Sequence, residues 1–470
     1  MLRTRLLICL FVFSSLIKTS TAAEWDNAFG VGFDVGYVDN IRLAPFGEEE
    51  SQYVTQITPF INLQGEGGRA SLDLNYQMQY VDYLSDDINN EIYHQLFADA
   101  NAELVEQLLF IDLSAANFQS AITSAASIPQ DNISISDNRT NITTTTISPY
   151  INTRIFSKAD LNIRYSHVDT KYDEFEDVQP DTTNENYLAE LSNTTTNDRG
   201  PLDWRLRYSK NELNTNLVES NYYEQSSLAL FYNISSQLVP YTTIGNEANK
   251  IVNTSFDEGG TFWNVGLTWR PTPRTMIIGE YGERFYGTSN SFSWTTRGRT
   301  TNISINYSEE ITNTGEVFAG RPPPTDAPVG SENEFIPISI RPYLRKRLES
   351  NIQYNYSKTN LNWYLFSEKR VYLTGEGEDK SYGINLNWDW TLTDRTSPNL
   401  NAGWQRIQSD LPTLFDNELL NFELSIVHTA SERLVSSIMY RYLKQNSNIP
   451  QNKYEQNSIS ANITLLFDNN

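Results

Sequence analysis

The stretch "SLDLNYQMQY", Ser71 to Tyr80, alternates between apolar or aromatic residues and polar residues at every position. The apolar set is Leu72, Leu74, Tyr76, Met78 and Tyr80, and the polar set is Ser71, Asp73, Asn75, Gln77 and Gln79. A β-strand directs successive side chains to opposite faces, whereas a helix would scatter both sets around its axis. The stretch therefore predicts a strand with one apolar face and one polar face.

The same alternation recurs along the chain, for example in "NLNWYLFSEK", "SYGINLNWDWTL" and "SISANITLLF". Roughly twenty such segments, each about 9 to 15 residues long, are separated by polar clusters containing Asn, Asp, Gly, Ser or Pro. The nearest approach to a helical pattern is "EIYHQLFADANAELVEQLLF", which also reads as a hairpin. The pattern predicts an all-β protein.

The connections between these segments are of two kinds. "WRPTPRT" (Trp269–Thr275), "WTLTDRT" (Trp390–Thr396) and "HTASERL" (His428–Leu434) share an aromatic residue, then Thr or Ser, any residue and Arg, and predict tight hairpin turns. Other connections, such as "SDDINN" and "TKYDEFEDVQPDTTNENY", are longer and acidic. Short turns at one end and long loops at the other are typical of an outer-membrane barrel.

The N-terminus has the pattern of a secretory signal peptide. "MLRTR" is basic, "LLICLFVFSSLI" is apolar but too short to cross a bilayer as a helix, and the small residues of "STAA" follow. We therefore expect residues 1–23 to be removed after Ala23 and residues 24–470 to form one domain. The single cysteine, Cys9, lies in the leader, which excludes a disulfide framework in the mature chain.

The mature chain is acidic and rich in aromatic residues. Without Arg3, Arg5 and Lys18 of the leader, 32 basic residues face 58 acidic ones, a net charge of −26. Such a charge repels nucleic acid, which excludes it as a partner. The chain contains 27 Tyr, 22 Phe and 9 Trp, yet its mean hydropathy is −0.48. Aromatic residues near strand ends suit the interfacial girdles of a membrane protein.

A closed barrel in lipid explains both faces of the strands. Hydrocarbon tolerates no unpaired strand edge, and barrel strands place apolar residues outside and polar residues inside. The predicted fold is a transmembrane antiparallel β-barrel of about 18–20 strands, with short periplasmic turns and long extracellular loops, in the bacterial outer membrane. We expect Asp73, Asn75 and Gln77 to face the lumen and Leu74 to face lipid. Outer-membrane lipid and lipopolysaccharide are the expected surroundings.

The last segment resembles the terminal assembly signal of bacterial outer-membrane proteins. Ser460, Leu465 and Phe467 match its polar, apolar and aromatic positions, while Asn462 replaces the usual Gly and "DNN" follows Phe467. The resemblance implies the barrel-assembly machinery as a partner.

The N-terminal region carries the most distinctive motifs: "DNIRL" at Asp39–Leu43, "ITPFINLQGEGGRA" at Ile57–Ala70, and the following "LDLNY". These motifs resemble the family of PEP-CTERM system-associated outer membrane proteins, with Phe60 where that family more often has Gly. Similar length and strand spacing extend to Phe467. The resemblance implies an outer-membrane barrel linked to exosortase sorting and exopolysaccharide production, and it implies no established reaction.

The sequence gives no pattern for catalysis. His94, His167 and His428 are far apart, no G-x-S-x-G motif occurs, and "GEGG" lacks the context of a phosphate-binding loop. We therefore predict no enzyme activity, no cofactor and no dedicated metal site. The acidic clusters "GEEES" and "YDEFED" read as solvated loops, or as weak divalent bridges to lipopolysaccharide.

The segment "GRPPPTDAPVG", Gly320–Gly330, is the candidate functional loop. Its prolines exclude it from a strand ladder. The candidate residues are Arg321, Pro322, Pro323, Pro324 and Asp326, which form either an external loop or a constriction folded into the lumen.

Three functions fit this sequence. The first is a conduit that assists export or surface assembly of exopolysaccharide, with sugars stacking on inward aromatic residues. The second is a general or cation-preferring porin, and the third is a structural or adhesive barrel without a pore. A continuous path of inward aromatic residues favours the first, and a charged lumen with few aromatic residues favours the second.

Overall fold

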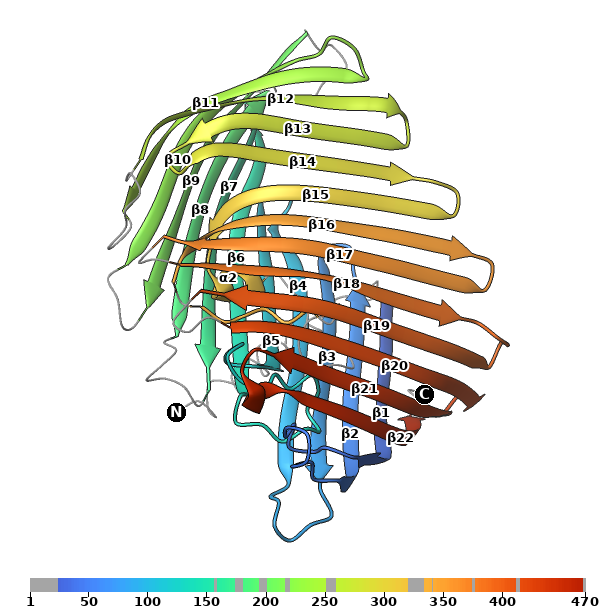
Figure 1. Cartoon of the computed structure of the whole chain (residues 1–470). Helices are drawn as coiled ribbons and strands as arrows, with labels where there is room; N and C mark the ends of the chain where they lie inside the picture. The colour runs from blue at the N-terminus through green and yellow to red at the C-terminus, as the bar shows by residue number, and fades with distance from the viewer. Residues whose placement is uncertain are drawn as a thin grey trace, which may run out of the picture.

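The computed structural model describes residues 24–155, 159–173, 181–193, 201–215, 220–250, 259–319, 334–339, 341–373, 377–410 and 415–467. In these ranges the chain forms 22 β-strands, each antiparallel to its neighbours in chain order. β1 (Glu24–Val38) also pairs with β22 (Tyr454–Phe467), from Phe29 opposite Phe467 to Val38 opposite Ser458. This last pairing closes the sheet and confirms the predicted antiparallel barrel (Figure 1).

The other strands in the first half are β2 (Gln52–Glu66), β3 (Ala70–Asp82), β4 (Glu91–Val105), β5 (Leu109–Ser120), β6 (Thr140–Ile155), β7 (Ala159–Tyr172), β8 (Thr182–Asn193), β9 (Leu202–Thr215), β10 (Asn221–Tyr232) and β11 (Leu238–Lys250). Those in the second half are β12 (Gly259–Thr272), β13 (Thr275–Arg284), β14 (Gly287–Arg297), β15 (Thr301–Thr312), β16 (Tyr343–Tyr356), β17 (Thr359–Tyr372), β18 (Glu378–Trp390), β19 (Thr396–Ser409), β20 (Phe415–Ser431) and β21 (Leu434–Ser447). The stretch "EIYHQLFADANAELVEQLLF", which comes nearest to a helical pattern, therefore forms β4 and the start of β5, a hairpin.

The strand number is even, as predicted, but it is 22 rather than 18–20. One reason is visible at β13 and β14, which are joined only by Phe285 and Tyr286. No polar cluster separates these two strands, so the sequence reads as fewer, longer segments. Among the described residues the helical elements are α2 (Thr314–Ala319) and η2 (Pro450–Asn452). No helix in this part of the chain is long and apolar enough to cross a membrane.

The two ends of the barrel differ as predicted. At one end the connections are short, such as residues 67–69, 273–274, 357–358 and 432–433. At the other end residues 39–51, 121–139 and 313–342 form long connections. The short-turn end is the periplasmic end of outer-membrane barrels. Both the first and last strands reach this end, since Glu24 lies opposite Glu66 and Phe467 opposite Phe29.

The three similar turn sequences have one local cause. In each, the Ser or Thr hydroxyl accepts a hydrogen bond from the backbone N–H of the Arg two residues later. The distances are 3.3 Å for Thr272 and Arg274, 3.3 Å for Thr393 and Arg395, and 3.3 Å for Ser431 and Arg433. This hydroxyl-to-backbone bond stabilises a tight turn, so the predicted hairpins are confirmed.

Candidate functional site

Two long connections fold into the barrel instead of extending outward. The first, residues 121–139 between β5 and β6, is called the β5–β6 segment below. The second consists of residues 313–319 and 334–339 between β15 and β16, and is called the β15–β16 segment. Both contact strands on different sides of the barrel, so they lie within its lumen (Figure 1). Side chains that touch them therefore define the inner face of the wall.

Hydrogen bonds from side chains to backbone fix the β5–β6 segment to β21 and β22. The Ile128 N–H donates to Gln445 Oε1 at 2.9 Å, and the Tyr454 hydroxyl donates to the Ile128 carbonyl at 2.7 Å. On the opposite side, Asn132 Nδ2 donates to Gln79 Oε1 of β3 at 2.8 Å. The segment thus connects β3, near the start of the chain, to β21 and β22, near its end.

The "DNIRL" motif joins the barrel seam to this segment. Asp39 accepts from the backbone N–H and the Nδ2 of Asn457 on β22, at 2.7 and 2.8 Å. Asn40 Nδ2 donates to the Glu455 carbonyl at 3.0 Å. Ile41, which is fully buried, accepts a backbone hydrogen bond from Ile135 of the β5–β6 segment at 2.8 Å. The most distinctive motif of the sequence is therefore a structural clamp.

Phe60, which departs from the resembled family, packs over β1. A Cβ atom added at Gly30 would lie 2.5 Å from Phe60 Cζ, so the glycine leaves the space that this ring occupies. The wall therefore has room for Phe60 because residue 30 is a glycine.

Aromatic and aliphatic packing places the β15–β16 segment. Phe318 of α2 meets Phe118 of β5 edge-to-face, with ring centroids 5.4 Å apart. Ile336 belongs to the same buried cluster, but its neighbour Phe335 packs against Ile407 and Leu419 across the lumen. Residues 335 and 336 therefore span the space between two parts of the wall.

A buried ion-pair network attaches this segment to β16 and β17. Arg347 donates to both oxygens of Glu334, from Nη1 at 2.8 Å and from Nη2 at 2.7 Å. It also donates to Glu368, which in turn pairs with Arg345 and Arg370 at 2.7 and 2.6 Å. The side chains of Arg347 and Glu334 are 4% and 3% exposed. Because each charge is desolvated, the network is stable only while its members stay paired.

Glu316 of α2 is a half-buried acid in the lumen. Its carboxylate accepts from Asn211 Nδ2 at 3.1 Å and from the Thr312 hydroxyl at 3.0 Å. Burial raises the pKa of Glu316 above its ordinary value, and nearby Glu310 acts in the same direction, while these two hydrogen bonds oppose the shift. The position of α2 against the barrel wall therefore favours the protonated form of the Glu316 carboxyl.

The structure places Asp73, Asn75 and Gln77 on the face of β3 that carries Gln79, which contacts the enclosed Asn132. Asn75 Nδ2 donates to Asp73 Oδ1 at 2.9 Å, and Gln77 donates to Gln95 of β4. Asp73 lies directly opposite Asp99. These three residues thus line an acidic and amide-rich part of the inner wall.

The candidate loop residues Arg321, Pro322, Pro323, Pro324 and Asp326 lie outside the described residues. Their neighbours on both sides, Phe318 and Glu334, belong to the segment within the lumen. The signal segment 1–23 also lies outside the described part of the chain.

A cavity of about 440 Å³ lies beside the enclosed segments, along β7–β11, β13 and β15. Asn211 contacts Glu316 of α2, and the strand register from Asn211 places Arg207, Tyr223 and Glu247 on the same inner face. The charged inner-face residues at this cavity are Arg164, Arg207, Glu247, Arg284 and Glu310. The open part of the lumen is therefore polar and rich in arginine.

Arginines on this side of the wall stack on aromatic rings. The Arg164 guanidinium carbon is 4.0 Å from the centre of the Tyr150 ring, and that of Arg205 is 5.4 Å from Phe231. Carboxylates hold both arginines in place, with Asp112 2.6 Å from Arg164 and Glu190 3.3 Å from Arg205. The Tyr150 ring also stacks on Phe110 and the Phe231 ring packs against Tyr241, with centroids 5.1 and 5.2 Å apart. These clusters place aromatic rings beside fixed hydrogen-bond donors on the inner wall. Sequence patterns do not reveal this feature, because the partners come from different strands.

The histidines are not brought together. His94 contacts Tyr76, with 2.9 Å between Nδ1 and the hydroxyl, His428 contacts Thr396, and His167 lies 3.2 Å from Asp169 between Nε2 and Oδ2. Among the described residues, no group of three or more His, Cys, Asp or Glu side chains is arranged to hold a metal ion.

The residues of the terminal assembly signal lie on β22. Leu465 and Phe467 are exposed on the outer face, the same face of the strand that carries Ile459 and Ile463. Ser460 has the opposite parity and lies opposite Gly36 of β1.

Comparison with known proteins supports the architecture. No protein-family profile and no curated protein matches the chain. Among solved structures, the FrpB iron transporter from Neisseria meningitidis is similar with a TM-score of 0.51 at 8% identity, covering 94% of this chain and 81% of that one. The siderophore receptor PirA from Acinetobacter baumannii gives 0.49 at 9% identity, covering 96% and 81%. The likeness to FrpB shows the fold, and the chain is an outer-membrane β-barrel.

Proposed function

We propose that this barrel is an outer-membrane conduit for carbohydrate chains, and that it assists export or surface assembly of exopolysaccharide in a PEP-CTERM and exosortase-linked system. The observation that carries the proposal is the inner wall formed by β6, β7, β9 and β10, where Arg164 stacks on Tyr150 and Arg205 on Phe231. The link to the PEP-CTERM system rests on the resemblance of the "DNIRL" and "ITPFINLQGEGGRA" motifs.

Sugars suit such a wall for two physical reasons. Their C–H groups pack against aromatic side chains, and their hydroxyl groups accept hydrogen bonds from arginine and donate them to carboxylates. Amide and hydroxyl side chains, such as Asn186, Ser209 and Gln225, line the cavity that Arg164 also lines and add further partners. None of these interactions requires a catalytic group.

The lumen argues against a general porin that prefers cations. The enclosed segments fill part of its cross-section, and the remaining cavity carries three inner-face arginines against two glutamates. The whole chain has a net negative charge, but the inner face at this cavity has more arginines than glutamates. In wide barrels an unobstructed lumen gives a general channel, whereas 22-stranded outer-membrane transporters hold a plugged lumen.

A second candidate is uptake of an anionic iron chelate. It is supported by the fold shared with an iron transporter and by the arginines at the open part of the lumen, which suit a ligand rich in negative oxygens.

A deletion strain tests these functions side by side. We expect loss of exported polysaccharide with normal uptake of ferric chelates and small solutes. Normal polysaccharide with impaired chelate uptake would support the second candidate, and general loss of small-solute uptake would support a porin. No change in any measurement would leave a structural barrel.

Complementation with point variants connects the phenotype to the cavity. Arg207→Gln changes an exposed arginine of the open lumen, so we expect it to reduce polysaccharide export. Arg406→Gln is the matched control, because Arg406 lies on the outer face and pairs with Asp416 there at 2.6 Å. This control should restore export fully when both variants reach the membrane in equal amounts.

A further inference from the structure

We infer that the outer wall of the barrel carries a binding site for phosphate groups of the outer-leaflet glycolipid, lipopolysaccharide, built from Lys346, Lys369 and Lys380. This site is independent of the lumen and of the solute that passes through it.

The three lysines form one row across adjacent strands. Lys346 of β16 lies directly opposite Lys369 of β17, and Lys369 lies directly opposite Lys380 of β18. All three alternate with inner-face residues, since Arg347, Glu368 and Asp379 beside them point into the barrel. Like charges directly opposite each other in a sheet are destabilising, so the row calls for a counter-anion.

The wall supplies only part of that negative charge. Glu378 lies 2.5 Å from Lys369 Nζ and 2.6 Å from Lys380 Nζ, so one carboxylate serves two ammonium groups. Lys346 Nζ is 3.4 Å from Glu309, which also accepts a hydrogen bond from the Tyr307 hydroxyl at 2.6 Å. Among the described residues, three lysines thus pair directly with two carboxylates, and Asp410 adds a longer-range attraction to Lys380.

The ammonium groups lie outside the carboxylates. The side chains of Lys346, Lys369 and Lys380 are 32%, 42% and 51% exposed, whereas those of Glu309 and Glu378 are 2% and 28% exposed. A molecule approaching the wall therefore meets the lysines first. Neighbouring strands are about 4.8 Å apart, so the row extends over roughly 10 Å.

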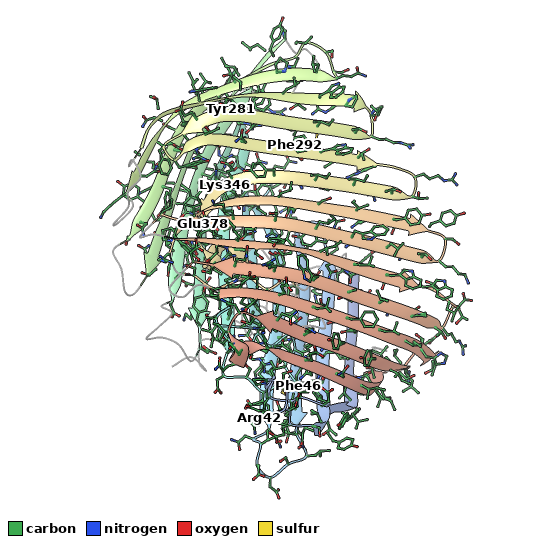
Figure 2. The ribbon with its side chains drawn as sticks, in the orientation of Figure 1. Arg42, Phe46, Tyr281, Phe292, Lys346 and Glu378 are labelled. Atoms are coloured by element: carbon green, nitrogen blue, oxygen red, sulfur yellow. The ribbon has the colours of Figure 1, made fainter. Side chains whose placement is uncertain are left out.

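The depth of the row suits a headgroup. The row lies near the extracellular end of the strands, as shown by Lys346 and Glu378 in Figure 2, and the short turn at residues 357–358 lies at the opposite end. Towards the membrane, the next outward residues of β16 and β18 are Leu348 and Tyr382, and the Tyr382 ring packs against Trp404 at 5.7 Å. Aromatic rings occupy the interface between hydrocarbon and headgroups, so phosphates attached to the glycolipid sugars would lie at the level of the lysines.

Thermal unfolding of the purified full-length mature protein in detergent tests this site with four probes: bisphosphorylated lipid A, the same lipid without phosphates, phosphatidylglycerol and inorganic phosphate. We expect bisphosphorylated lipid A alone to raise the unfolding temperature strongly. An ammonium group near an anionic surface contributes about 1 kcal/mol, or about fivefold in affinity. The triple variant Lys346→Gln/Lys369→Gln/Lys380→Gln should therefore bind lipid A at least tenfold more weakly.

Two further variants separate the site from general effects. Lys444→Gln removes a lysine that pairs with Glu455 at 2.5 Å on the outer face of β21, apart from the row, and should leave lipid A binding unchanged. Glu378→Gln removes the shared carboxylate and should strengthen binding severalfold, which a merely unfolded variant cannot do. Equal binding by wild type and triple variant, an unchanged affinity in Glu378→Gln, or an equal response to inorganic phosphate or phosphatidylglycerol would overturn the proposal.

Discussion

Replacement of Arg347 by methionine should release the β15–β16 segment from the barrel wall. Arg347 is the residue that joins Glu334 of this segment to Glu368 of β17, with contacts of 2.7 Å to each carboxylate. Methionine retains much of the aliphatic volume but removes all the donors. Glu368 would keep Arg345 and Arg370 as partners, so the unpaired charge is left chiefly on Glu334.

The magnitude follows from the burial of this pair. Removing one partner of a buried ion pair costs about 3–5 kcal/mol, because the other charge stays desolvated. At 1.4 kcal/mol per factor of ten, the equilibrium between docked and released segment should shift by roughly 10² to 10³ or more towards release. Replacing both partners by apolar residues, as in Arg347→Met/Glu334→Leu, should recover most of this loss.

Single-channel recording in planar bilayers measures the release. We expect Arg347→Met to give larger or more frequent openings than the wild type, and the double variant to return towards it. Arg406→Met is the matched control, because its ion pair with Asp416 lies on the outer face and is about one-third exposed. Identical conductance in the wild type and Arg347→Met, with both correctly folded, would refute the role of Arg347 as an anchor.

Three further outcomes follow from the structure. Leu74→Arg on the lipid-facing parity should lower the free energy of unfolding in vesicles by ~2–4 kcal/mol, whereas Asn75→Arg should mainly alter permeation; equal damage in urea titrations would contradict the assigned faces. Because burial raises the pKa of Glu316 above its ordinary value of 4.5, docking of α2 should be strongest below that value and weaken as pH rises through the raised pKa. Glu316→Gln should abolish this pH dependence in thermal unfolding. Phe318→Ala removes the ring that packs on Phe118 and should cost ~3–5 kcal/mol of docking, seen as faster proteolysis of this segment than in a Phe46→Ala control, whose ring is 99% exposed.

The features that the sequence predicted correctly are local ones. Alternation within "SLDLNYQMQY" depends only on the two-residue period of a strand, and the hairpin turns depend on a hydroxyl that bonds two residues ahead, as in Thr393 and Arg395. The strand number was predicted less well, because two residues suffice to connect β13 to β14 and leave no polar cluster in the sequence.

The path of the long connections could not be predicted in this way. Residues 121–139 are polar enough for an external loop, yet Ile128 is 1% exposed inside the barrel. A retrospective signal is the mixture of isoleucines with amide and hydroxyl residues, which suits a segment that must satisfy its hydrogen bonds within a wall. Only the closed barrel brings Gln445 and Gln79 close enough to bond to the same segment.

Short stretches of sequence are enough to identify the class of protein, since periodicity, a leader-like N-terminus and two kinds of connection are local properties. Tertiary structure alone decided what the lumen contains. Ile128 and Gln445, or Phe118 and Phe318, become partners only when elements distant in sequence meet inside one closed wall. The physical reason is that strand alternation specifies which face a side chain occupies, but closure and register specify which other side chains it meets.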